Sequence, residues 1–359
     1  MFKSKVGLSV LVLILAISVV LSGCSSSKGP KDALEGSISK MSGLNSYAFS
    51  GNFKLDELDI ADDTEQGAIA MNVLKNSEIS WTGVYQKDPA MTELTLKLDL
   101  KGDFSINLSI PMIVTEKKIW VKIPNAAMLG IPEELVGKYI ELDLEDLAAQ
   151  SGQSIKGVDV TNSQKFSQDI MAIVFKHIDQ NAYLSSVKTK DAALPEALGV
   201  KQVVQFHIEK SQLESFITTV VEKIAPEVVE LLSKNADYRE LFGLTEEQID
   251  EAKDSLATAK SDLSNNIADL KNGLTKFDIL AVIGIDKNEY PVYTDATVKF
   301  GGESEEFTGS IAMKVITQLT KVNEKVTFEY GEPASADIIP FEEMFGDLGG
   351  LMGGFSSDY

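Results

Sequence analysis

The chain is poor in the residues that most catalytic and metal sites use. Its 359 residues include one cysteine, Cys24, and two histidines, His177 and His207. A single cysteine excludes an intramolecular disulfide, so packing has to stabilise the fold. Neither histidine lies in an HExxH motif or beside a GxSxG motif, and no phosphate-binding glycine loop follows a predicted strand. We therefore predict no enzyme activity, no cofactor and no metal site, and interpret both histidines as solvated or capping side chains.

Basic residues are also scarce. The chain has 33 lysines and arginines against 54 aspartates and glutamates, a formal net charge of −21. Such a surface is repelled by nucleic acid and by anionic headgroups, so we predict no nucleic-acid partner. The acidic run 59–65 lacks the spacing and the turn glycine of a calcium loop, which favours solvated charge. A glycosidase-like pair of carboxylates stays open, because the distance within such a pair exists only in space.

The longest apolar run lies at the N-terminus. Lys3 and Lys5 precede the apolar stretch 6–20, and small residues follow it before Cys24. This order is typical of a secretory signal peptide, and the run is shorter than the roughly 20 residues of a membrane-spanning helix. We predict a signal peptide over 1–23 and a tether over 24–32, where the serine-rich sequence has linker composition. That composition disfavours the alternative of Cys24 as a buried core residue.

The sequence Leu-Ser-Gly-Cys that ends at Cys24 resembles the lipobox of bacterial lipoproteins. In that class the cysteine receives a diacylglyceryl group, with fatty acyl chains such as palmitate, and becomes the mature N-terminus. The resemblance implies lipidation at Cys24 and a lipid-anchored position on the extracytoplasmic face of the cell membrane. Two or more acyl chains hold a protein stably on a bilayer.

Alternating apolar and polar residues predict strands over much of the chain. After a short helix with Leu34, Ile38 and Met41 on one face, alternation begins at Tyr47. The predicted strands are 47–55, 69–74, 79–85, 94–100, 104–110, 119–123, 138–144, 183–189, 200–209, 277–285, 292–300, 311–315 and 326–330. Gly102 and Asp103 supply the turn of the clearest hairpin, and the acidic residues 56–65 are predicted to form a loop.

Helical patterns are concentrated between residues 166 and 273. An amphipathic stretch runs from Phe166 to Val174, and capping boxes are predicted at Ser211–Glu214 and Thr245–Gln248. Pro226 is expected to kink or split the first capped helix. The second carries a heptad of Ile249, Leu256, Leu263 and Leu270, which indicates either an intermolecular coiled coil or packing on the preceding helix. We favour the second interpretation because only about three repeats occur.

Trp120 lies on the polar side of its predicted strand, between Lys118 and Lys122. Either a loop covers it or it is a contact point, and the first is the more common arrangement. At the C-terminus, residues 333–359 are predicted to be a flexible tail with a short helix over 340–346.

These patterns together predict an α+β fold. A large antiparallel sheet with one apolar side would curl into an incomplete barrel, and helices would cover its apolar concave side. We expect one domain over 33–332 that includes the helical region 211–272.

Three phrases resemble the LolA/LolB-like and LppX/LprG-like group of extracytoplasmic lipoproteins. They are the segment 41–51, the pair of strands 118–124 and 138–143, and the turn 285–292. The resemblance implies a half-barrel around helices that can hold acyl chains.

We accordingly predict a non-catalytic lipoprotein, held on the membrane by its anchor, that binds an acyl lipid or another apolar ligand between sheet and helices. The alternative is a surface scaffold with a fully packed core, acting through an unidentified protein partner. The predicted ligand-lining residues are Phe49, Phe53, Leu96, Leu98, Phe104, Ile106, Leu108, Phe216 and Val220.

Overall fold

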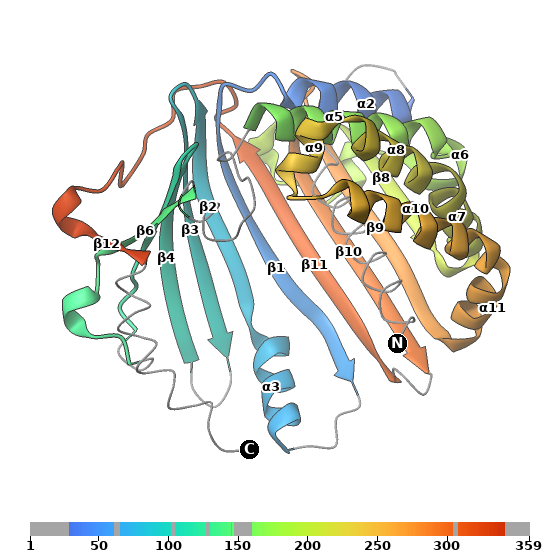
Figure 1. The fold of residues 1–359 in the computed structure, drawn as a ribbon, viewed down its shortest axis with the longest axis horizontal. Coiled ribbons are helices and arrows are strands. Elements are labelled where there is room, and N and C mark those ends of the chain that lie inside the picture. Colours follow the sequence, from blue (N-terminus) through green and yellow to red (C-terminus); the bar gives the residue numbers. More distant parts are fainter. Residues whose placement is uncertain are drawn as a thin grey trace.

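One large open sheet organises the protein (Figure 1). The computed structural model describes residues 29–60, 65–101, 105–126, 130–144, 146, 160–303 and 308–341. Twelve strands of these residues form a single sheet in the order β12-β6-β5-β4-β3-β2-β1-β11-β10-β9-β8-β7. Because β12 and β7 lie at opposite ends of this order, the sheet is not closed. Together with its helices, the sheet confirms the predicted α+β class.

The strands follow the predicted alternation closely. They are β1 (Ser46–Ile60), β2 (Glu78–Lys87), β3 (Ala90–Lys101), β4 (Ser105–Thr115), β5 (Lys118–Lys122), β6 (Tyr139–Asp143), β7 (Leu184–Val187), β8 (Val200–Glu209), β9 (Leu274–Asp286), β10 (Pro291–Glu303), β11 (Thr308–Thr320) and β12 (Ile338–Pro340). In the predicted hairpin, Leu96 lies opposite Ile110 and Leu98 opposite Leu108. This register keeps the apolar side chains of β3 and β4 on one side of the sheet.

The sheet is mixed, and the prediction of a purely antiparallel sheet was wrong at its last strand. β12 pairs with β6 in parallel, with Ile338 opposite Tyr139. Parallel strands cannot be joined by a tight hairpin, and β6 and β12 are separated in the sequence by β7 to β11. Residues 335–340 form a turn and this strand, so the sheet includes part of the segment that the sequence assigned to a flexible tail. The predicted helix 340–346 lies almost wholly outside the described residues.

The helices are grouped between β6 and β9 in the sequence. They are α2 (Pro30–Met41), α3 (Glu65–Asn76), α5 (Val160–His177), α6 (Gln180–Tyr183), α7 (Leu213–Thr219), α8 (Ala225–Lys234), α9 (Ala236–Leu241), α10 (Glu246–Ser261) and α11 (Leu263–Gly273), together with 3-10 turns at 133–135, 189–191, 196–198, 210–212 and 335–337. α2 and α3 are the exceptions, since they flank β1. The acidic loop predicted from Asp56 was wrong because β1 continues to Ile60, and the strand predicted over 69–74 is the helix α3.

Pro226 splits its helix as predicted, through a π-helical turn over Val220–Ile224 that precedes α8. Proline donates no backbone hydrogen bond, and the wider turn restores pairing by joining the Ala225 N–H to the Val220 carbonyl. The capping box predicted at Ser211 was wrong: Glu209 and Gln212 form it instead. The box at Thr245 and Gln248 is confirmed.

The heptad helix is divided at Asp262 into α10 and α11. α10 contacts α8, and α11 contacts α7 and β9, so packing against the preceding helices is confirmed. Ile249 and Ile267 are buried, whereas Leu270 is exposed. None of the described helices is both long and apolar enough to cross a membrane.

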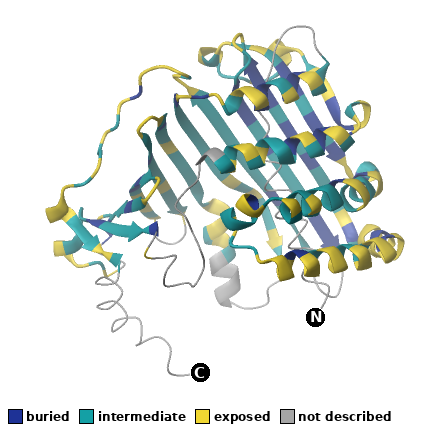
Figure 2. Cartoon of the chain, turned by 45° about the horizontal axis from the view of Figure 1, so that its top comes forward, coloured by how far each residue is buried: buried dark blue, intermediate teal, exposed yellow. Residues whose placement is uncertain are grey.

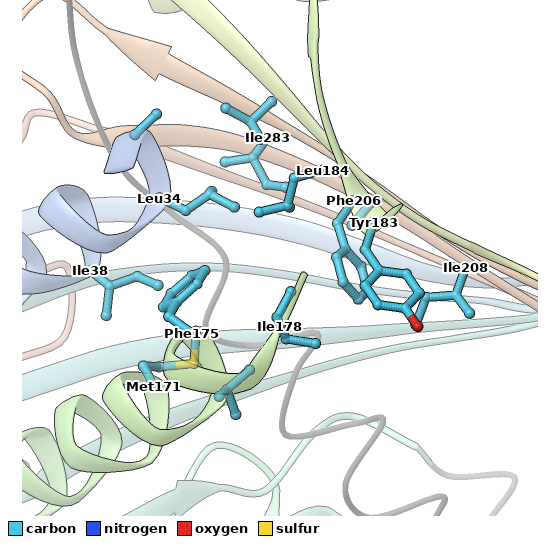
Figure 3. Packing of buried hydrophobic residues seen from close by; sticks show 14 of the residues in the cluster. Leu34, Ile38, Met171, Phe175, Ile178, Tyr183, Leu184, Phe206, Ile208 and Ile283 are labelled. Atoms are coloured by element: carbon cyan, nitrogen blue, oxygen red, sulfur yellow. The ribbon is translucent and has the colours of Figure 1, made fainter. Parts of the chain in front are cut away.

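Helices α2, α5 and α7 pack on one side of β8, β9 and β10. Their buried residues form a single cluster with strand residues such as Val204, Ile208 and Ile283, each 0% exposed. Figure 3 shows Leu34 and Ile38 of α2 beside Met171 and other residues of α5 in this cluster. The cluster is the main hydrophobic core, and it belongs to one half of the sheet.

An extended segment, residues 321–337, covers the side of the sheet that faces away from the helices, in the half of the sheet far from β8. We call this segment the C-terminal strap. The strand predicted over 326–330 was wrong, because this segment crosses the sheet without pairing as a strand. Glu93 of β3 is 5% exposed and accepts hydrogen bonds from the backbone N–H groups of Glu329 (2.6 Å), Tyr330 (2.9 Å) and Gly331 (2.6 Å). These bonds replace the strand pairing that the strap lacks.

Trp120 belongs to this covered region. It is 6% exposed, clusters with Ile113, Tyr139, Tyr330 and Ile338, and donates an Nε1 hydrogen bond of 2.8 Å to Glu141. The prediction that a loop covers Trp120 is therefore confirmed.

Candidate functional site

Six of the predicted ligand-lining residues lie on one side of the sheet. Directly opposed residues of neighbouring strands share a side, and Phe53, Ile79, Leu98 and Leu108 form such a row across β1, β2, β3 and β4. Alternation along each strand places Phe49, Leu96 and Ile106 on the same side. The structure thus brings together Phe49, Phe53, Leu96, Leu98, Ile106 and Leu108.

The other predicted residues lie elsewhere. Phe216 is 6% exposed and packs edge-to-face on Tyr183 at a centroid distance of 5.9 Å, and Val220 packs against the same cluster. These two side chains fill the core between helices and sheet and do not extend the row. Phe104 and Cys24 lie outside the described residues.

The row that contains Phe53 continues beneath the helices. Phe53 lies opposite Val315 of β11, and Val315 lies opposite Ala296 of β10. Ala296 is opposite Ala281, which is opposite Phe206. One side of the sheet therefore carries apolar residues continuously from β8 to β4, and the helices pack on this same side.

Exposure divides this side into two halves. Under the helices, Val204, Ile208 and Ile283 are 0% exposed. Beyond them the apolar residues of the sheet are only partly buried, apart from the buried Tyr85, and Figure 2 shows this intermediate burial along the central strands. We call this second half the apolar face: Tyr47, Phe49, Phe53, Ile79, Trp81, Tyr85, Leu94, Leu96, Leu98, Leu100, Ile106, Leu108, Ile110, Met112 and Val114, with Ile119 and Val121 of β5, Ile140 and Leu142 of β6, and Val315 and Leu319 of β11.

Two glycines allow two aromatic rings of the apolar face, those of Phe49 and Trp81, to lie against the backbone. We call these two rings the aromatic floor. A Cβ atom at Gly83 would lie 2.4 Å from Cζ of Phe49, and one at Gly51 would lie 2.5 Å from Cζ2 of Trp81. Each glycine is directly opposite the aromatic residue whose ring covers it. The two rings therefore lie flat on β1 and β2, because no side chain lifts them from the backbone.

A pair of tyrosines ends this aromatic floor. Tyr47 and Tyr85 lie opposite each other, with ring centroids 5.1 Å apart. Burial, and secondarily the nearby Tyr85, raise the pKa of Tyr47 to about 12, and burial alone raises the pKa of Tyr85. Both phenols are therefore protonated at neutral pH and remain hydrogen-bond donors. Tyr85 is 7% exposed, and its buried hydroxyl has no hydrogen-bond partner among the residues that the structure describes.

Trp81 and Tyr85 were missed by the sequence prediction of the site. The available signal was the position of Gly51 and Gly83 within strongly apolar strands, since an internal strand glycine often marks a close approach of other groups. The register that sets these glycines against aromatic rings was needed to interpret that signal.

The two histidines pair with carboxylates away from the apolar face. His177 Nε2 is 2.8 Å from Glu227 Oε1, and Lys176 binds the same carboxylate at 2.7 Å. These hydrogen bonds, from Lys176 first and then from His177, hold the pKa of Glu227 below its usual value. Among the described residues, no group of three His, Cys, Asp or Glu side chains is arranged to hold a metal ion.

His207 belongs to a ladder of charges on the polar side of the sheet. Its Nε2 atom is 2.7 Å from Asp278 Oδ1, and Lys299 Nζ is 3.1 Å from Asp278 Oδ2. Burial opposes ionisation of Asp278, but the bonds from His207 and Lys299 outweigh it and hold the pKa of this carboxyl below its usual value. The three residues link β8, β9 and β10.

The Asp286–Tyr290 loop is a tight turn. The Asp286 carboxylate accepts hydrogen bonds from the backbone N–H groups of Asn288 (2.9 Å) and Tyr290 (2.8 Å). The carboxylate therefore caps its own turn.

The sequence matches no protein-family model and none of the curated proteins with which it was compared.

Proposed function

We propose that the protein is a non-catalytic lipoprotein of the extracytoplasmic membrane surface that binds an acyl lipid or another apolar ligand. In this proposal the sheet is an incomplete barrel, helices cover part of its inner side, and the ligand covers the remaining apolar face beside them. Cys24 carries the lipid anchor.

The observation that carries the proposal is the apolar face. Its side chains continue the rows that the helices bury over β8 to β10, yet all but Tyr85 are only partly buried. Contiguous partly exposed apolar surface of this kind marks sites for ligands, membranes or partners. Burying about ten methylene groups there would contribute about 8 kcal/mol before ordering costs, enough to retain an acyl chain.

The charge of the protein is consistent with a lipid anchor as its attachment to the membrane. A chain with a net charge of −21 is repelled by anionic headgroups. Acyl chains at Cys24 would overcome this repulsion and keep the apolar face near a source of lipid.

Native mass spectrometry of the full chain, gently extracted from membranes, tests the proposal. We expect the protein mass plus an acyl lipid. Leu96→Gln places a polar group on the apolar face and should reduce the lipid-bound fraction about tenfold, because one polar group left unpaired against the ligand costs about 1–3 kcal/mol. Lys97→Gln is the matched control, since Lys97 is the next residue on the same strand, is exposed and points to the opposite side.

Lipid-free protein from every preparation would contradict the proposal, and so would equal lipid retention by both variants. Mass spectrometry of the N-terminal peptide tests the anchor separately. An unmodified Cys24 in membrane-extracted protein would remove the anchor from the proposal.

A scaffold role is the second candidate, and Phe242 favours it. This residue at the end of α9 is 53% exposed and contacts Phe166 at a centroid distance of 4.9 Å. A photocrosslinker at position 242 would capture a protein partner in cells if the helices form a docking surface. If the protein crosslinked through position 242 also carries as much lipid as the uncrosslinked protein, lipid binding and partner binding would belong to separate surfaces.

A further inference from the structure

The apolar face extends to the edge of the sheet at β12. Ile339 of β12 lies opposite Ile140 of β6, which belongs to the apolar face. The preceding residue, Ile338, belongs instead to the cluster around Trp120 on the opposite side. Strand alternation therefore puts Ile339 on the side of the apolar face. The described part of the chain ends two residues later, at Phe341, so the sequence that follows starts at the border of this face.

That sequence combines large apolar residues with glycine. Residues 342–359 contain two phenylalanines, two leucines, two methionines and five glycines, and no lysine or arginine. A linker exposed to water is usually polar, because large apolar side chains gain free energy when they are buried. Methionine adapts its shape to uneven apolar surfaces, and glycine lets the backbone approach them closely. The composition therefore suits contact with an apolar surface better than it suits a solvated linker.

The segment 342–359 is long enough to cross the apolar face. From β6 to β1 the face covers five spacings between neighbouring strands, or about 24 Å. An extended chain spans about 3.3 Å per residue, so these 18 residues reach about 60 Å. The segment can therefore start beside β6 and reach the aromatic floor of Phe49 and Trp81.

Attachment to the same chain favours this occupant over a second copy of the protein. A segment joined directly to β12 meets the face at an effective concentration of about 1 mM, whereas a second copy must be bound from dilute solution. Two copies with a net charge of −21 each also repel one another.

Resting on the proposed function for the ligand that is displaced, we infer that residues 342–359 bind the apolar face of their own chain and compete there with the acyl lipid. The segment shields the apolar side chains of β1 to β6 while the protein is empty. Lipid then binds only to molecules whose face is uncovered, so its apparent affinity falls by the fraction of molecules that are covered.

Photocrosslinking tests where the segment lies. A photocrosslinking residue in place of Leu351, in lipid-free full-length protein, should react with peptides of β2, β3 and β4, at a yield that does not change on dilution. Leu96→Gln should lower this yield several-fold, because it places a polar group on the face. Lys97→Gln is the control on the opposite side of the same strand and should leave the yield unchanged. Crosslinks to the C-terminal strap, or between two copies, would overturn the inference.

The affinity for a fluorescent diacylglycerol tests the competition. Full-length protein with Phe345→Ser, Leu348→Ser and Phe355→Ser combined should bind this probe about tenfold more tightly than the wild type, the factor expected when the segment covers about nine of ten molecules. The matched control combines Glu342→Gln, Glu343→Gln and Asp347→Asn in the same segment and should keep the wild-type affinity. Equal affinities of all three proteins would overturn the inference.

The inference and the proposed function fail separately. Crosslinks to β2, β3 and β4 without diacylglycerol binding by any of the proteins would support the position of the segment and contradict the proposed ligand. Diacylglycerol binding without these crosslinks would overturn the inference and leave the proposed function intact.

Discussion

The two halves of the sheet have the same sequence pattern and different environments. β8, β9 and β10 alternate apolar and polar residues, and so do β1, β3 and β4. On the first set Ile208 and Ile283 are 0% exposed, whereas Leu96 and Leu98 on the second are only partly buried. Alternation therefore specifies which side of a strand is apolar, but not what covers it.

The two halves also differ on their polar side. On the polar side of the covered half, Asp278 pairs with both His207 and Lys299 and so links three strands. Behind the apolar face, the C-terminal strap packs on Trp120 and is held by Glu93. Of the described helices, α3 contacts β1 and β3, and the large helical layer covers β8 to β10 instead. The half outside this layer is thus stabilised from its polar side, which allows its apolar face to stay available.

The largest difference between the halves is expected in the response to truncation. Ile283→Ala should lower the free energy of unfolding by about 4 kcal/mol, because it leaves a cavity in a packed core. Ile110→Ala on the apolar face should cost about 1 kcal/mol, because the position is already partly exposed and leaves no closed cavity. Urea denaturation of both variants measures the difference, and equal losses would show that the two halves are equally packed.

Releasing the C-terminal strap from Glu93 should cause the next largest loss in the free energy of unfolding. Glu93→Ala removes the acceptor of three backbone hydrogen bonds and should cost about 3 kcal/mol. Amide hydrogen exchange should accelerate at Glu329, Tyr330 and Gly331. Asp99→Ala is the control on the same side of the same strand: its carboxylate pairs with Lys101 near the surface, and its loss should stay within about 0.5 kcal/mol. Slow exchange in Glu93→Ala would contradict the anchoring role.

The ion-pair ladder should make the covered half sensitive to acid. Because the folded pKa of Asp278 is lowered, its contribution is complete above the unfolded pKa of about 4 and is lost as pH falls through the lower folded pKa. Asp278→Asn should therefore reduce stability at neutral pH by about 1 kcal/mol and flatten its dependence on pH below about 4. Thermal unfolding between neutral and acid pH measures this.

Asp250→Asn provides the comparison, since that carboxylate is 72% exposed and pairs with Lys253 along its own helix. Its pH profile should follow the wild type. An Asp278→Asn profile that also follows the wild type would exclude the ladder as a source of stability.

The smallest effect is expected in the helical layer itself. Thr245→Ala removes the side chain that accepts the Gln248 N–H at the start of α10 and should cost about 0.5–1 kcal/mol. Thr258→Ala, at an exposed position inside the same helix, should be neutral or slightly stabilising because alanine has the higher helix propensity. Thermal melting distinguishes the two, and equal effects would show that the cap does not matter.

Some errors of the sequence prediction have a common physical cause. α3 was predicted as a strand because Ile69, Met71 and Val73 alternate, a spacing that a short helix can also contain. The strap was predicted as a strand because Val326, Phe328 and Tyr330 alternate, yet its backbone is held by Glu93. Local alternation cannot tell which partner the backbone will find.

The candidate site was only partly accessible from sequence. Six of the nine predicted residues share the apolar face, because strand alternation and hairpin register follow from local chemistry. Phe216 was misplaced because a helical residue of the same type can fill a core. Tyr85 could not be recognised at all, since the burial of its ring and hydroxyl is a property of its surroundings.

The sequence by itself determined most strands of the sheet, the apolar side of the alternating ones and the start of α10, because these depend on residues within a few positions of one another. Only the tertiary structure decided that the helices cover β8 to β10, that the C-terminal strap returns across the opposite side, and that β12 pairs in parallel with β6. These arrangements depend on contacts between residues that are far apart in the chain, and the periodicity of a single segment carries no information about them.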